Sequence, residues 1–192
     1  ESAGIATVHD GKIALKKSPG SVDAVFPLGG DWHGSLLGSV GVGHVRYPSP
    51  IMSRLVGESR FAHPFLSCDG RIVLVHNGTV NDYREIWSEL GDEHEFSSFD
   101  RELDAVNDSE MIVHLLEKDV QESRGAMAEA VRNTCERLSR NGRNQFLFAC
   151  VCVAEPWRVY VVSGRDFEGK RKVVVGHREG FGSVFASYRD SG

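Results

Sequence analysis

The N-terminal part of the chain alternates short apolar runs with glycine-rich turns. Residues 5–15 (IATVHDGKIAL) predict two strands around Asp10-Gly11, because Asp-Gly between β-type segments is a strong hairpin signal. Residues 40–47 (VGVGHVRY) and 71–78 (RIVLVHNG) predict two further strands. The first strand begins close to the start of the chain, although chain ends are usually loose unless a sheet holds them.

Helical periodicity dominates the middle of the chain. Apolar residues recur at helical spacing in residues 81–90, 108–118 and 121–141, which predicts three helices. Asp108 is the predicted N-cap of the second helix. The segment 91–107 between the first two helices is polar and acidic, and we expect it to be exposed.

The last third of the chain again predicts strands, separated by turn residues. They are FLFACVCVA (146–154), RVYVVSG (158–164), KVVVGHR (172–178) and SVFASY (183–188). The order of strands, helices and strands predicts an α+β domain, in which mainly antiparallel sheet packs against helices. We see no internal repeat or linker, so we expect one domain over residues 1–192.

Composition narrows the function classes. A length of 192 residues, 41% hydrophobic content and a net charge of -5 favour an ordinary globular domain and argue against nucleic acid as a partner. No apolar run approaches the roughly 20 residues of a membrane helix, so we expect no membrane partner. The cysteines at positions 68, 135, 150 and 152 suit neither a disulfide framework nor a zinc motif, which favours a reducing, cytoplasmic setting.

The histidines give no metal-binding signal in the sequence. None of the eight shows an H-x-x-x-H spacing, so we expect no metal site. His44 and His76 lie inside predicted strands and are interpreted as hydrogen-bonded core residues. The pair of cysteines at 150 and 152 is likewise interpreted as small buried residues.

Three positions offer polar groups that could bind a small ligand. Arg46 ends a strand, where its planar guanidinium could bind a carboxylate or point into solvent. Asn77 and Gly78 could form a turn, or their side-chain amide and backbone N–H could converge on an oxyanion. Asp108 could bind an ammonium group as well as cap its helix. Taken singly, each position favours the ordinary structural interpretation.

The order of four short motifs along the chain is more specific than any one of them. GHVRY, AHPF, HNGTVNDY and DSEMI, in this order, resemble the amidotransferase domain of class II glutamine amidotransferases, which are N-terminal nucleophile (Ntn) hydrolases. The resemblance runs from Gly4 to about Ser187, and GHVRY with HNG is especially similar to the glutaminase domain of amidophosphoribosyltransferase. It implies a four-layer αββα sandwich of two mainly antiparallel sheets. The predicted order of strands and helices agrees with that fold.

The resemblance also implies a role for each candidate residue. The ligand is glutamine, whose α-carboxylate would bind Arg46 and whose α-amine would bind Asp108. The Asn77 side chain and the Gly78 N–H would form the oxyanion hole. Because each polar end of glutamine meets a complementary group, analogues lacking one end would be rejected.

Two further residues take their roles from the resemblance alone. Tyr47 would help line the pocket, and Ser49 occupies a position where the family often has a hydroxyl residue near the substrate.

The nucleophile is the point where the chain departs from the family. The family's terminal Cys-Gly-Ile aligns with Ala3-Gly4-Ile5, and Glu1 and Ser2 precede it. In the family the thiolate attacks the carboxamide of glutamine with the free α-amine as base, ammonia leaves, and water releases glutamate, with no cofactor. Since alanine has no nucleophile, whether this chain is an enzyme stays open.

Three explanations for Ala3 remain. An active glutaminase could have had this position changed, or the protein could have lost its Cys naturally and serve as a glutamine-binding sensor or scaffold. Alternatively, loss of Glu1 could make Ser2 a terminal nucleophile. These residues contain no ammonia-accepting region, so we expect a synthase domain or subunit as partner.

Overall fold

The computed structural model describes residues 1–47, 57–164 and 171–189. β1 (Ser2–His9), β2 (Lys12–Pro19) and β3 (Val40–Arg46) form an antiparallel sheet in the order β2-β1-β3. Asp10 and Gly11 join β1 to β2 with φ angles of 47° and 70°. Two consecutive residues with positive φ suit the tight turns that match strand twist, which confirms the predicted hairpin.

A second antiparallel sheet contains the middle and later strands. It consists of β4 (Phe65–Leu66), β5 (Ile72–Thr79), β6 (Gln145–Cys152) and β7 (Tyr160–Ser163), in that order. A separate hairpin follows, made of β8 (Arg171–Arg178) and β9 (Gly182–Arg189). All the strands predicted from the sequence are therefore present.

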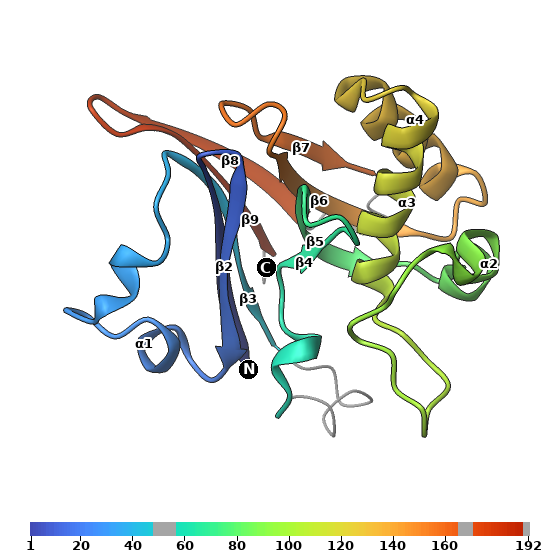
Figure 1. Ribbon diagram of the computed structural model, residues 1–192, viewed down its shortest axis with the longest axis horizontal. Coiled ribbons are helices and arrows are strands. Elements are labelled where there is room, and N and C mark those ends of the chain that lie inside the picture. Colours follow the sequence, from blue (N-terminus) through green and yellow to red (C-terminus); the bar gives the residue numbers. More distant parts are fainter. Residues whose placement is uncertain (48–56, 165–170, 190–192) are drawn as a thin grey trace.

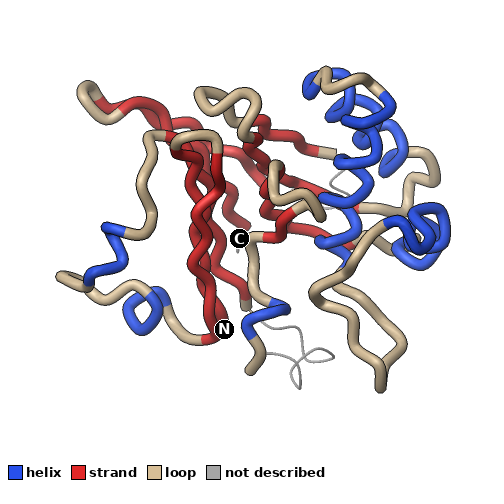
Figure 2. The backbone as a smooth tube through the Cα atoms, in the orientation of Figure 1, coloured by secondary structure: helices blue, strands red, loops and turns tan. Residues whose placement is uncertain are grey.

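Helices cover the outer faces of the two sheets. α1 (Val22–Val25) lies against the first sheet, and α2 (Tyr83–Leu90), α3 (Asp108–Glu122) and α4 (Met127–Ser139) lie against the second (Figure 1). Short 3-10 turns span Asp31–Gly34, Ser59–Phe61 and Gly91–Glu93. Figure 2 shows the strands between helices on either side, as the four-layer αββα sandwich requires.

Side-chain alternation along β5 separates two cores. Leu74 faces the helices and joins a cluster that includes Met111, Leu116 and Phe148. Val73 and Val75 point the other way and pack between the sheets against side chains such as Ala6 and Val42. Because β5 is buried on both faces, its sequence IVLV is a continuous apolar run without alternating polar residues.

The cap of α3 differs from the sequence prediction. Asn107, not Asp108, is the N-cap, and its side chain accepts a hydrogen bond from the Ser109 N–H. Asp108 is the first helical residue. Asn and Asp are both favourable N-cap residues. When they are adjacent, the path of the preceding loop determines which of them occupies the N-cap position.

Two other predictions about the helical region need correction. α3 continues to Glu122, and α4 begins at Met127 rather than at residue 121, because Arg124 and Gly125 both adopt positive φ and end the first helix. The segment 91–107 is also not wholly exposed, since Ser98 is buried against α3. Among the described residues, no helix combines the length and apolarity needed to cross a membrane.

Candidate functional site

Arg46 lies at the end of β3, on the side of the first sheet that faces the second sheet. The alternation along β3 places Val42, His44 and Arg46 on one face, and Val42 packs between the sheets. Burial lowers the pKa of the half-buried Arg46 guanidinium, while the negative charge of Asp108 acts in the opposite direction. Arg46 and Asp108 are therefore close enough to interact electrostatically.

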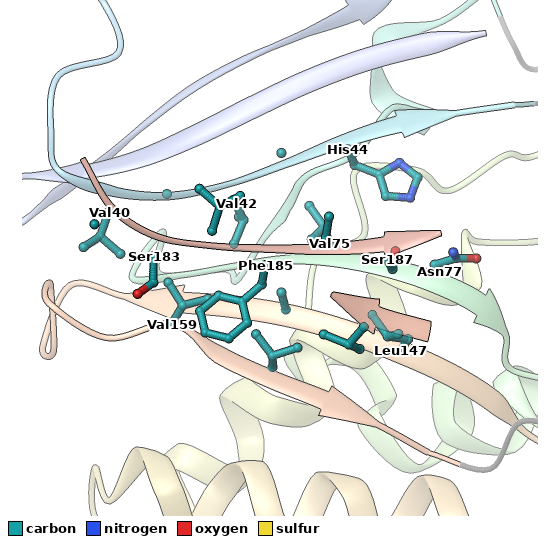
Figure 3. Close-up of a pocket in the computed structure, with 18 of the residues that line it drawn as sticks. Val40, Val42, His44, Val75, Asn77, Leu147, Val159, Ser183, Phe185 and Ser187 are labelled. Carbon is teal, nitrogen blue, oxygen red and sulfur yellow. The ribbon is translucent and has the colours of Figure 1, made fainter. Parts of the chain in front are cut away.

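Asn77 and Gly78 lie near the C-terminal end of β5, on the second sheet. The Asn77 side chain lies in the space between β3 and β5, near His44 (Figure 3). A Cβ at Gly78 would lie 2.1 Å from the carbonyl oxygen of Gln145 on β6 and 2.5 Å from Nε2 of His76. Only glycine fits there, so the close pairing of β5 with β6 explains this residue without reference to function.

Asp108 is held beside the end of β5 by two hydrogen bonds. Its Oδ2 accepts the backbone N–H of Val80 at 2.9 Å, and its Oδ1 accepts the hydroxyl of Ser109 at 3.3 Å. Val80 follows Gly78 by only two residues. The carboxylate at the start of α3 is thus fixed relative to the Asn77-Gly78 backbone.

Three histidines lie next to these groups: His63 and His76 are buried, and His44 is partly buried. The rings of His44 and His63 stack with centroids 4.2 Å apart, and the His76 N–H donates to Nδ1 of His63 at 3.3 Å. Nδ1 of His76 lies 2.8 Å from the hydroxyl of Ser109. His76 is therefore a hydrogen-bonded core residue, as the sequence analysis interpreted it.

Two of these histidines, His44 and His63, are uncharged at neutral pH. Burial, together with the charges of His76 and Arg46, lowers the pKa of His44 to about 4. Burial and the neighbouring cations also hold the pKa of His63 well below its usual range. Sequence reasoning assigned no role to His63, although it stands in the AHPF motif that supported the resemblance.

The segment that carries His63 is fixed to the first sheet by Lys17. The ammonium group donates to the carbonyl oxygens of Ala62 at 2.7 Å and Pro64 at 2.9 Å, and burial lowers its pKa to about 8. Gly4 on β1 allows this approach, because a Cβ there would lie 2.0 Å from the His63 carbonyl oxygen.

A cavity of about 910 Å³ lies between the sheets. His44 and Asn77 stand at one end, and apolar residues such as Val42, Val75 and Phe185 line the rest (Figure 3). Residues of β9, including Ser183 and Phe185, also line it. The cavity is therefore largely apolar, with polar groups at the end where Asn77 of β5 lies.

Comparisons with known proteins assign the family. The chain matches the model of the glutamine amidotransferase domain over residues 53–191. The chain belongs to the class II glutamine amidotransferases. The glutamine–fructose-6-phosphate aminotransferase of Pyrococcus horikoshii is 32% identical over 162 residues, which are 84% of this chain and 24% of that protein. The Methanothermobacter thermautotrophicus protein of the same name is 34% identical over 163 residues, 83% of this chain and 24% of that protein.

A solved structure shares the fold of this amidotransferase domain. The glutamine phosphoribosylpyrophosphate amidotransferase from B. subtilis, in complex with ADP and GMP, superimposes with a TM-score of 0.68 at 21% identity. The alignment covers 96% of this chain and 35% of that one, so the Ntn-hydrolase fold expected from the sequence is confirmed. The chain spans about a quarter of the length of the curated relatives.

The structure does not bring Ala3 together with the other candidate residues of the amidotransferase site. Ala3 is only 2% exposed, and it packs with Val25 and Phe26 beneath α1. Its neighbours in the strand, Gly4 and Ala6, point toward the second sheet instead. The alternation of β1 therefore turns the Ala3 side chain away from Asn77.

The two remaining candidates add little to the described site. Tyr47 follows Arg46 directly and is 75% exposed, so it reaches solvent at the edge of the site. Ser49 lies outside the described residues. Their roles in lining the pocket stay predictions.

Proposed function

We propose that this domain binds L-glutamine at the junction of β3, β5 and α3. Arg46 binds the α-carboxylate, Asp108 binds the α-ammonium group, and Asn77 with Gly78 binds the carboxamide oxygen. The observation that supports this most is geometric: Asp108 accepts the N–H of Val80, two residues after Gly78, beside the cavity that Asn77 lines. A zwitterionic amino acid carries both complementary charges.

The same groups suit hydrolysis of the amide by a thiol. When a thiolate attacks the carboxamide carbon, the C=O π electrons move onto the oxygen, and the Asn77 amide and Gly78 N–H would stabilise that negative charge. The C–N bond then breaks, the amide nitrogen is protonated and leaves as ammonia, and a thioester remains. Water cleaves the thioester to give glutamate and the free thiol. Neutral His44 and His63 leave Arg46 as the cationic group for the carboxylate.

The four cysteines of the chain are not suited to supply that thiol. Cys150 and Cys152 lie in the core between the second sheet and the helices, and Cys135 packs against the same core from α4. Cys68 contacts His114, which follows Asp108 by six residues on α3. Glutamine binding without hydrolysis, as in a sensor or scaffold, therefore remains a second proposal that uses the same binding residues.

The acceptor of any released ammonia would lie outside this domain. We propose that residues 1–192 form one glutaminase-type domain and that a synthase domain or subunit receives the ammonia. Relatives named as aminotransferases are about four times as long as the matched region, which supports this arrangement. We propose a cytoplasmic setting for the domain, which the four free cysteines support.

Calorimetry with a set of glutamine analogues tests the proposed binding mode. We expect L-glutamine to bind saturably, and L-norvaline, glutaramate and 4-aminobutanamide to bind at least about tenfold more weakly. Each lacks one of the three polar ends, and the buried partner of that end would be left unsatisfied. Equal affinity for glutamine and any one of these analogues would contradict the role of the corresponding residue.

A further inference from the structure

Four side chains with metal-binding atoms meet beside α3: Cys68, His94, His114 and Glu117. Their ligand atoms all lie within 4.8 Å of one another. Cys68 lies between β4 and β5, His94 follows the turn after α2, and the other two lie on α3. Because they come from three separate segments, short sequence spacings give no sign of the group.

Four of the six separations among these atoms are close to the edges of a tetrahedron around a metal ion, and the other two are at most 4.8 Å. Sγ of Cys68 lies 3.6 Å from Nδ1 of His94 and 3.5 Å from Nδ1 of His114. Oε2 of Glu117 lies 3.2 Å from the first nitrogen and 3.3 Å from the second. Zinc bonds of about 2.3 Å to sulfur and about 2.05 Å to nitrogen or oxygen give tetrahedral edges of about 3.55 Å and about 3.35 Å.

Backbone groups orient two of these side chains toward the centre of the cluster. The Glu117 carboxylate accepts the N–H groups of Cys68 and Asp69, each at 3.0 Å. The Glu95 N–H lies 3.3 Å from Sγ of Cys68 and donates toward it. Such outer contacts hold ligands in place before an ion arrives.

A carboxylate also lies near the distal nitrogen of His114. Its Nδ1 faces the cluster, while its Nε2 lies 3.9 Å from Oε1 of Glu110. Glu110 is itself fixed, because the Ser97 N–H and hydroxyl donate to its Oε1 at 2.8 Å and 2.6 Å. The 3.9 Å separation is too long for a hydrogen bond, but it places a carboxylate behind the distal nitrogen, where such a group can orient a metal-bound ring.

The cluster is shielded on all but one side. The side chains of His94, His114 and Glu117 are 5%, 1% and 4% exposed. Cys68 is exposed, so an ion could enter past its sulfur. Three buried ligands and one accessible thiol suit a site that is filled from solvent.

We propose that Cys68, His94, His114 and Glu117 bind one Zn²⁺ ion as a structural site. Four protein ligands complete a tetrahedron, so the site leaves no position for a substrate. On binding, the Cys68 thiol releases its proton to solvent and its sulfur forms a bond to the ion. The ion would fasten the β4–β5 loop and the segment after α2 onto α3.

Cobalt substitution tests the site directly. The purified protein is stripped with a chelator and titrated with Co²⁺ alone. We expect a complex with one Co²⁺ that shows a thiolate-to-cobalt charge-transfer band and the visible bands of tetrahedral cobalt. Added Zn²⁺ should displace the cobalt and raise the thermal midpoint of the stripped protein, because the ion binds the native state.

Two variants separate this site from adventitious binding. Cys68→Ser should remove the charge-transfer band and weaken Co²⁺ binding at least about tenfold, whereas Cys135→Ser, a thiol on α4, should leave both unchanged. Circular dichroism checks that the variants fold, and His94→Asn gives a second test through weaker binding. Absence of a complex with one Co²⁺ in the parent protein, or a band unchanged by Cys68→Ser, would overturn the proposal. Neither result bears on glutamine binding.

Discussion

At the scale of single residues, the opposite charges of the candidate site do not neutralise each other directly. Among the described residues no ion pair joins Arg46 to Asp108, and the Asp108 carboxylate is satisfied by Val80 and Ser109. Arg46 still senses the negative charge of Asp108. The two groups are therefore not paired with each other, as the proposed binding of a zwitterionic ligand requires.

The orientation of Ala3 leads to a prediction about the nucleophile. A chain that begins at residue 3 and carries Ala3→Cys should release no glutamine-dependent ammonia above background. Its thiol would lie with Val25 and Phe26 on the face of the first sheet opposite to the second sheet. An ammonia assay with glutamine as substrate measures this.

The matched control is the chain that begins at Ala3 without the substitution. Circular dichroism shows whether both chains fold. Robust ammonia release from Ala3→Cys alone would contradict the orientation of β1 and support an active glutaminase whose Cys was changed.

The sequence allowed some site residues to be predicted and not others. Asn77 and Gly78 were recognisable because a turn-type pair follows a long apolar strand. His63 was not, since its importance arises from stacking on His44, 19 residues earlier in the chain. Such a contact depends on how two sheets pack, which local spacing does not encode.

At the scale of elements, a buried polar network supports the end of β5. Asp82 precedes the first residue of α2, and its carboxylate accepts hydrogen bonds from Arg137 on α4 at 3.2 Å and from Asn144 before β6 at 2.6 Å. Arg137 also forms two hydrogen bonds with Glu89 of α2. The network joins α2, α4 and β6 just beyond Gly78, so it positions the turn that follows the proposed oxyanion hole.

Asp82→Asn should therefore destabilise the fold. The Asp82 side chain is fully buried, and we expect its loss of charge to lower the free energy of unfolding by about 2–4 kcal/mol. Glu85→Gln is the matched control, because Glu85 pairs with Arg143 where the two side chains are 56% and 60% exposed. That change should cost less than about 1 kcal/mol.

Urea unfolding of the two variants and the parent protein measures the difference. If Asp82→Asn and Glu85→Gln cost the same, the network contributes no more than an ordinary surface ion pair.

The elements themselves were largely predictable, and their ends were less so. Period-two and helical patterns identified the strands and the three longer helices. The boundary between α3 and α4 was missed because the apolar spacing continues across it, and only Arg124 and Gly125 with positive φ interrupt the helix. A positive φ at arginine is not visible in sequence.

At the scale of the whole molecule, the site lies where two separately packed layers meet. The first sheet contributes Arg46 and His44, and the second sheet with α3 contributes Asn77, Gly78 and Asp108. Lys17 connects the layers through the Ala62 and Pro64 carbonyl groups. The sequence predicted that these residues come together only through its resemblance to a family. Local hydrophobic patterns do not determine which face of one sheet packs against the other.

The central claim is that these layers form a glutamine-binding site, and titration calorimetry tests it most directly. Glutamine is titrated into the parent protein, into Arg46→Gln, and into Arg132→Gln, whose arginine is exposed on α4. We predict binding of one glutamine to the parent and to Arg132→Gln, and affinity at least about tenfold lower in Arg46→Gln, because the carboxylate loses its charged partner. No binding to the parent protein, or equal binding in all three, would contradict the account.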